Sequence, residues 1–221
     1  LRNQLEQTGI KKPIASIVTQ VLVSKDDPAF KNPSKPIGPF YTEEEAKKIA
    51  KARGVTVKED AGRGWRKVVP SPMPLSIIES DLIKIAISNG AIVVASGGGG
   101  IPVYYDEHGR LTGLEAVIDK DFAAEKLAET IDADVLLILT AVDTVKINYK
   151  KPDEQSIDQI TVGDAFKLIA QGQFAAGSML PKVEAGINFV AGANKRTCII
   201  TSPEKASQAV EGKAGTRIIA G

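Results

Sequence analysis

The sequence predicts an α/β fold with a mostly parallel sheet that is covered by helices on both faces. Three observations carry this prediction. From Leu75 onward, short apolar runs alternate with amphipathic stretches, four consecutive glycines follow one apolar run directly, and a charged, proline-rich segment interrupts the alternation once. Short buried strands separated by helices are typical of parallel sheets with right-handed crossovers. Ligands of such sheets bind at the carboxyl ends of the strands.

The first predicted elements are the end of a helix and a strand. LRNQLEQTG has the pattern of a helix that stops at Gly9, since glycine is favoured just past a helix end. Leu1 is not a methionine, so we expect the start of this helix, and a further segment of chain, to lie upstream. The run ASIVTQVLV, residues 15–23, predicts the first strand.

The later elements follow from the period of the apolar residues, which is close to 3.6 in helices and which gives short continuous runs in buried strands. We expect strands over residues 91–96, 134–140, 196–202 and 217–220. We expect helices over residues 76–89, 121–131, 162–170, 179–190 and 205–210.

Composition limits the kind of partner. The chain of 221 residues is 43% hydrophobic, enough for one sizeable core, and its 28 Lys and Arg nearly balance 27 Asp and Glu. This balance provides no field that attracts nucleic acid or an anionic membrane, so small-molecule partners are expected. No apolar run reaches the ~18 residues of a membrane helix. The single Cys198 forms no internal disulfide, which suits a cytoplasmic protein.

Residues 24–68 break the α/β alternation. This segment holds four prolines, at positions 28, 33, 36 and 39, and residues 24–67 contain eleven Lys and Arg against seven Asp and Glu, a net charge of +4. Runs of charge are most often solvated surface. The alternative hypothesis is an inserted lid subdomain that closes over phosphate groups.

Gly97, Gly98, Gly99 and Gly100 directly follow the apolar run AIVVAS. Backbone without side chains can approach a ligand closely, and its amides can hold phosphate oxygens. Neither a P-loop nor a dinucleotide fingerprint is present, because Pro102 and Val103 occupy the positions where the fingerprint needs its last glycine. The glycines therefore predict a ligand-binding turn, with a flexible surface turn as the alternative.

Two further helix starts carry charged residues. Asp119, Lys120 and Asp121 open one predicted helix, where an aspartate either caps the helix or helps to bind a ligand. Lys182 lies in the first turn of the helix opened by GSMLPKVEA, where a phosphate near the helix start would offset its unfavourable place in the helix dipole. Thr140 is the last residue of the strand DVLLILT and Asp143 follows it, so both lie at the carboxyl end of the strand, where a nucleotide can bind.

Taken together, five motifs resemble the carbamate kinases, in order and over nearly the whole chain. They are DPAFKNPSKPIGPF, KEDAGRGWRKVVPSP, GGGGIP, EAVIDKDFAAEKLAE and GSMLPKVEA. The resemblance implies a three-layer α/β/α sandwich of the amino acid kinase type over residues 1–221, with residues 24–68 as the lid, and a homodimer. It also implies reversible phosphoryl transfer between ATP and carbamate with Mg²⁺, which gives ADP and carbamoyl phosphate and makes ATP during arginine breakdown.

The resemblance also assigns the site residues. It places three active-site lysines at Lys35, Lys120 and Lys182, and the aspartate that orients them at Asp121. Gly97 to Gly100 would line the path of the phosphate. On the nucleotide side the matching residues are Thr140, Asp143, Tyr149 and Met179. No protein ligand for a metal is expected, because the nucleotide phosphates carry the Mg²⁺.

One departure from the family keeps alternatives open. Carbamate kinases carry a GGNA-like and a GNGPQ-like loop before the first residue matched here, and neither loop occurs in the sequence. The alternatives are another phosphotransferase of the amino acid kinase family, a nucleotide-binding chain without catalysis, and a purely structural domain.

Overall fold

The computed structural model describes residues 1–60, 62–193 and 195–221, and they divide into two compact units. The first unit consists of Leu1–Glu59 and Arg63–Ala123. The second consists of Asp60–Gly62 and Ala124–Gly221. Residue 61 of the predicted lid lies outside the described residues.

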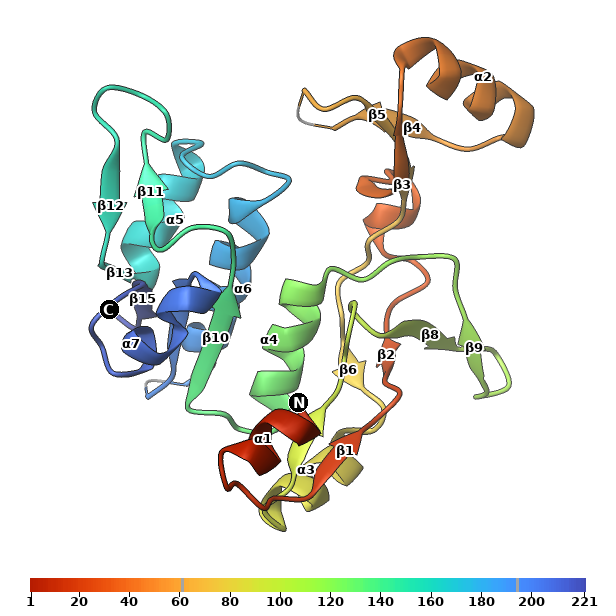
Figure 1. The fold of residues 1–221 in the computed structure, drawn as a ribbon. Helices are drawn as coiled ribbons and strands as arrows, with labels where there is room; N and C mark the ends of the chain where they lie inside the picture. Colours follow the sequence, from red (N-terminus) through yellow and green to blue (C-terminus); the bar gives the residue numbers. More distant parts are fainter. Residues whose placement is uncertain (61, 194) are drawn as a thin grey trace. The chain divides into compact units, whose positions relative to one another are not determined.

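The first unit carries two small sheets besides that of the predicted lid (Figure 1). Its elements before and after that segment are α1 (Arg2–Gln7), β1 (Ile14–Ser16), β2 (Gln20–Leu22), β6 (Ser76–Ile77), α3 (Ser80–Ser88), β7 (Ile92–Val94), β8 (Ile101–Tyr105) and β9 (Leu111–Gly113). β1 pairs with β7 in parallel, and the other sheet has the order β6-β2-β8-β9 with β2 and β8 parallel. Val21, Ile83, Val103 and Ile118 are at most 3% exposed and form its core.

The predicted lid range contains an antiparallel sheet and one helix, drawn in orange in Figure 1. After a short 3-10 turn, Pro28–Phe30, come β3 (Lys35–Tyr41), α2 (Glu43–Arg53), β4 (Val57–Glu59) and β5 (Trp65–Val69), in the sheet order β3-β5-β4. Local sequence explains α2 fully. Thr42 and Glu45 form a capping box, and Gly54 ends the helix in the left-handed conformation with φ 63°. That this segment acts as a lid stays a prediction.

The second unit has a four-stranded sheet of order β10-β14-β15-β13. α4 (Lys120–Thr130) runs into this unit, followed by β10 (Val135–Leu139), β11 (Val145–Ile147), β12 (Gln155–Ile157), β13 (Gln159–Thr161), α5 (Val162–Ala170), α6 (Met179–Ala191), β14 (Thr197–Thr201), α7 (Ala206–Val210) and β15 (Thr216–Ile219). Cys198 and the next three residues of β14 are at most 1% exposed, so both faces of the sheet are covered. Gly186 of α6 packs directly on Cys198, as expected for a small apolar residue.

The predicted α/β class is confirmed, while several element bounds and pairings differ from the expectation. The strand predicted over residues 15–23 is two strands in two sheets, because the Thr19 hydroxyl donates to the Ile17 carbonyl and accepts the Ser96 amide at 2.8 Å. Residues 76–77 form a strand, and the helix predicted from residue 76 begins at Ser80. Antiparallel pairs accompany the predicted parallel ones, for example between β14 and β15.

Candidate functional site

The glycine run after β7 divides into two pairs with different surroundings. Gly99 has φ 120° and Gly100 has φ 81°, and a side chain at either position would overlap the Ile118 carbonyl or the Val21 side chain. Gly97 and Gly98 face open space, since a methyl group added to either would have no other heavy atom within 4 Å. The first pair of glycines is therefore free for a ligand, whereas the second pair allows close packing.

Gly97, Gly98 and Gly100 line a cavity of about 450 Å³ in the first unit. Its other walls come from the residues between β1 and β2, from the start of β8 and from the segment before α4: Ile17, Val18, Thr19, Ile101, Ala116 and Val117. A cavity of this size admits a phosphate or another small anion. The predicted ligand-binding turn thus lies beside a space that a ligand can enter.

Asp119 connects the predicted lid to the start of α4. One carboxylate oxygen forms an ion pair with the Lys35 ammonium at the start of β3, and the other accepts the backbone amide of Asp121 at 2.8 Å. The side chains of Lys35 and Asp119 are 30% and 13% exposed. Sequence reasoning considered Asp119 as a helix cap or a ligand-binding residue, so its ion pair with Lys35 is new.

The charges around Asp119 decide its ionisation. Burial alone would raise the pKa of Asp119, but the hydrogen bonds from Lys35 and from the Asp121 amide, together with the positive charges of Lys35 and Lys120, lower it below the ordinary value. The Lys120 ammonium lies 3.7 Å from the Asp121 carboxylate, and Lys120 is largely exposed while Asp121 is buried. Three of the four predicted catalytic residues, namely Lys35, Lys120 and Asp121, thus lie in this neighbourhood.

In the second unit, three of the four predicted nucleotide residues line a cavity of about 430 Å³. These are Thr140, Tyr149 and Met179, and the cavity also has walls from Ala141, Val142, Thr144, Lys146, Asn148, Lys151, Gly172, Gln173, Ala175 and Ser178. The fourth, Asp143, is exposed and does not line the cavity; its backbone carbonyl accepts the Thr201 hydroxyl at 3.0 Å. The cavity has the size and the largely apolar lining of a small-molecule site.

Two side-chain contacts fix one wall of this cavity. The backbone amide of Asn148 donates to the Gln173 side-chain oxygen at 2.8 Å, and the Asn148 backbone is in the left-handed conformation with φ 50°. Lys146 pairs with Glu154 at 2.5 Å, and this hydrogen bond raises the pKa of Lys146.

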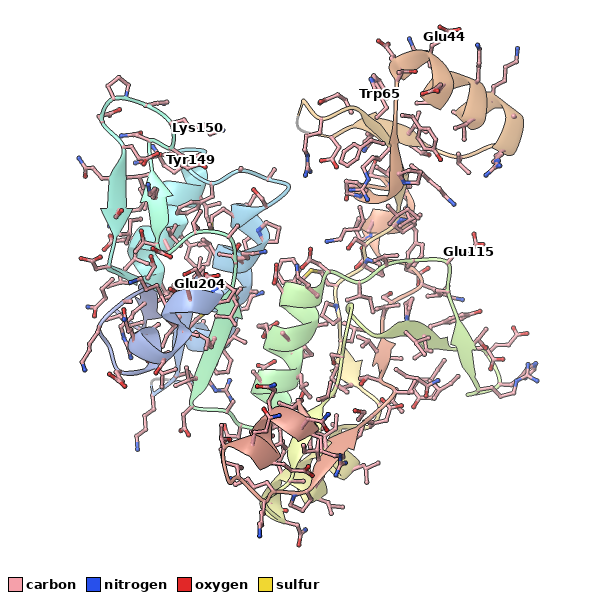
Figure 2. The ribbon with its side chains drawn as sticks, viewed as in Figure 1. Glu44, Trp65, Glu115, Tyr149, Lys150 and Glu204 are labelled. Carbon is pink, nitrogen blue, oxygen red and sulfur yellow. The ribbon has the colours of Figure 1, made fainter. Side chains whose placement is uncertain are left out.

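Figure 2 shows Tyr149 and Lys150 next to each other on the connection from β11 to β12, with the Lys150 ammonium 5.5 Å from the centre of the Tyr149 ring. Sequence reasoning missed Gln173, because no local spacing signals a contact across 25 residues.

Lys182 lies half-buried in the first turn of α6, where Pro181 precedes it as expected. The amides of Ser178, Met179 and Leu180 all point to the Ala175 carbonyl, at 3.1 Å each. These hydrogen bonds connect the helix start to Ala175, which lines the cavity. Lys182 and the cavity belong to the same unit.

Within the described ranges, His, Cys, Asp and Glu side chains form no group of three or more that is arranged to hold a metal ion. None of the helices in the described part of the chain is both long enough and apolar enough to cross a membrane.

Comparison with known proteins identifies the family. The amino acid kinase family matches residues 14–202. The chain is 55% identical to the carbamate kinase of Clostridium perfringens and 53% identical to that of Thermococcus kodakarensis, in each case over 219 residues that cover 99% of the chain and 69% of the relative. A structure of carbamate kinase from Giardia lamblia bound to AMP-PNP is 47% identical, with a TM-score of 0.87 over 99% of the chain and 69% of that structure.

The same Giardia enzyme bound to citric acid superimposes with a TM-score of 0.91 at 44% identity. Identity near 50% over nearly the whole chain, together with this similarity of fold, confirms the resemblance that the five motifs indicated. The chain belongs to the amino acid kinase family and, within it, to the carbamate kinases.

Proposed function

We propose that this chain catalyses reversible phosphoryl transfer between ATP and carbamate, giving ADP and carbamoyl phosphate. The observation that carries the proposal is the 55% identity to a carbamate kinase over 99% of the chain. The two cavities support it, since one adjoins an open glycine turn suited to phosphate and the other has a mostly apolar lining suited to a nucleotide base. The relative bound to AMP-PNP, an ATP analogue, is consistent with the second assignment.

Phosphoryl transfer needs positioning of two substrates in line and compensation of the charge on the moving group. In this proposal Lys35, Lys120 and Lys182 compensate that charge, and Asp121 orients them through charge-assisted hydrogen bonds. Gly97 and Gly98 present backbone amides to phosphate oxygens. Thr140, Asp143, Tyr149 and Met179 hold the nucleotide. Each of these roles is carried over from the family.

The nucleotide enters as its Mg²⁺ complex, so the metal belongs to the substrate. We expect the nucleotide phosphates and water molecules, with no dedicated set of protein ligands, to carry the Mg²⁺. Mg²⁺ supplies charge neutralisation on the nucleotide phosphates when it is bound with them. We further propose that the protein is a cytoplasmic homodimer that makes ATP from carbamoyl phosphate during arginine breakdown and binds no nucleic acid.

The test is ATP formation from ADP and carbamoyl phosphate with Mg²⁺, measured for the chain, for Lys182→Ala and for Lys167→Ala. Lys167 is a matched control, because it lies in the same unit and its side chain is 74% exposed. We expect Lys182→Ala to lower kcat by about 100-fold or more, as loss of a group that stabilises the transition state does. Lys167→Ala should retain full activity.

Three outcomes would contradict the proposal. Equal rates of ATP formation by the chain and by Lys182→Ala would show that Lys182 takes no part in the reaction. ADP binding without ATP formation in any variant would favour a nucleotide-binding chain without catalysis, and activity on a different acyl phosphate alone would favour another phosphotransferase of the family.

A further inference from the structure

We infer that Asp119 is a positioning residue that holds the Lys35 ammonium at the start of α4. The inference rests on the proposed function for the role of Lys35 and on the observed contacts for the role of Asp119. Asp119 and Lys35 are 84 residues apart in the sequence, so their ion pair is a long-range tertiary contact that connects β3 to the start of α4. It is distinct from the predicted orienting role of Asp121.

Each carboxylate oxygen of Asp119 has its own partner. Oδ2 accepts from the Lys35 ammonium, and Oδ1 accepts the Asp121 amide at 2.8 Å. The helix-capping bond fixes the carboxylate on α4, and the fixed carboxylate then fixes the ammonium. Because the Asp119 side chain is only 13% exposed, water screens this pair less than it screens a surface ion pair.

The charges around the pair are two lysines and two carboxylates. Lys35 and Lys120 both act on Asp119, Lys120 also lies 3.7 Å from the Asp121 carboxylate, and the dipole of the helix that starts here adds partial positive charge. An incoming phosphoryl group would find Lys35 already oriented, and the cost of ordering this long side chain would not fall on the reaction. In this proposal Asp119 holds the Lys35 ammonium in position and does not itself contact the reacting atoms.

Three variants separate the two functions of Asp119. Asp119→Asn keeps an oxygen that can accept the Asp121 amide but removes the charge that pairs with Lys35. Asp119→Ala removes both. Asp106→Asn is the matched control. Like Asp119, Asp106 combines backbone-amide hydrogen bonds, here from His108 and Arg110, with an ion pair, here to the Arg110 side chain in the β8–β9 hairpin.

The first measurement is the labelling rate of Lys35 by an amine-reactive reagent, read by mass spectrometry on the full chain. We expect a several-fold faster rate in Asp119→Asn, with the melting temperature within a few degrees of the parent, and no change in Asp106→Asn. This readout does not depend on catalysis, so it tests the positioning even if the proposed function fails. An unchanged labelling rate in Asp119→Asn would overturn the inference.

The second measurement is a double-mutant cycle on ATP formation. We expect Asp119→Asn to lower kcat by about 10- to 100-fold, with a smaller effect on the KM for ADP, since misplacement of a charge-compensating group acts mainly on the chemical step. On the Lys35→Ala background the same substitution should have little further effect. Equal losses on both backgrounds would show that Asp119 does not act through Lys35.

Discussion

Glu125 of α4 is a buried carboxyl group with 3% exposure and an upward-shifted pKa of about 6. Burial is the main cause; the neighbouring charge of Glu129 raises the pKa further, and those of Lys126 and Arg196 lower it. The folded chain therefore holds a proton on Glu125 between pH 4.5 and about 6 that the unfolded chain releases. Stability from this group is present at low pH and is lost as the pH rises through that window.

The prediction at this residue is that Glu125→Gln, which imitates the protonated form, stabilises the protein above pH 6. The shift of about 1.5 pKa units corresponds to about 2 kcal/mol at pH 8. Urea unfolding from pH 4.5 to 8 measures it, and the difference from the parent should grow across the window. Glu211→Gln, which removes a surface partner of Lys213, is the control. A substitution that destabilises equally at pH 5 and pH 8 would contradict the assignment.

Single residues also show how far sequence reasoning reaches. The local pattern at the start of α4 was sufficient to offer Asp119 or Asp121 as a helix cap, because helix starts have a recognisable pattern. The site roles of Lys120 and Asp121 came from the resemblance to carbamate kinases and stay predictions. The partners of Asp119 and Asn148 lie 84 and 25 residues away, so no spacing predicts them. Asp143 matched the family pattern, yet it lies outside the lining of the cavity, because lining depends on the direction of a loop.

At the scale of elements, the glycine turn between β7 and β8 has two roles, which fall on different glycines: one allows close packing and the other leaves room for a ligand. We predict that Gly99→Ala destabilises the fold by about 3 kcal/mol or more, since the added methyl would overlap the Ile118 carbonyl at a φ of 120°. Gly97→Ala meets open space and should leave the free energy of unfolding within about 1 kcal/mol, while it lowers kcat by crowding the ligand. Chemical denaturation and ATP formation, measured on both variants, distinguish the two roles. Equal stability of the two variants would contradict this division.

Elements with strong local signals were predicted well, and those broken by tertiary contacts were not. α5 has the expected bounds, and α6 ends one residue later than expected. The run ASIVTQVLV contains no glycine or proline, so its break at Thr19 has no local signal. The hydrogen bond between Thr19 and Ser96, 77 residues apart, causes the break.

At the scale of the whole molecule, the alternation of apolar and amphipathic segments was sufficient to predict the α/β class. The order of the strands in each sheet could not be predicted from it. Parallel pairing of β10 with β14 follows from the intervening helices, as expected. The antiparallel pairing of β14 with β15 does not, since the segment between them also contains a helix. The order of strands depends on which apolar faces meet, and several orders satisfy one apolar pattern.

The last prediction concerns how ADP stabilises a molecule of two units. The residues predicted to hold the nucleotide belong to the second unit, and two amides report on the walls there: Thr140, which donates to the Thr201 carbonyl at 2.8 Å, and Asn148, which donates to Gln173. Local opening of these walls releases ADP, so at 100 times its Kd bound ADP should slow their hydrogen exchange by about 100-fold, equivalent to about 2.7 kcal/mol. The Asp106 amide of the β8–β9 hairpin, which donates to the Arg110 carbonyl, opens without disturbing the cavity and should exchange at the same rate. Hydrogen exchange measured by mass spectrometry with and without ADP tests whether the nucleotide binds in this cavity. Unchanged exchange rates at Thr140 and Asn148 with bound ADP would place the nucleotide elsewhere.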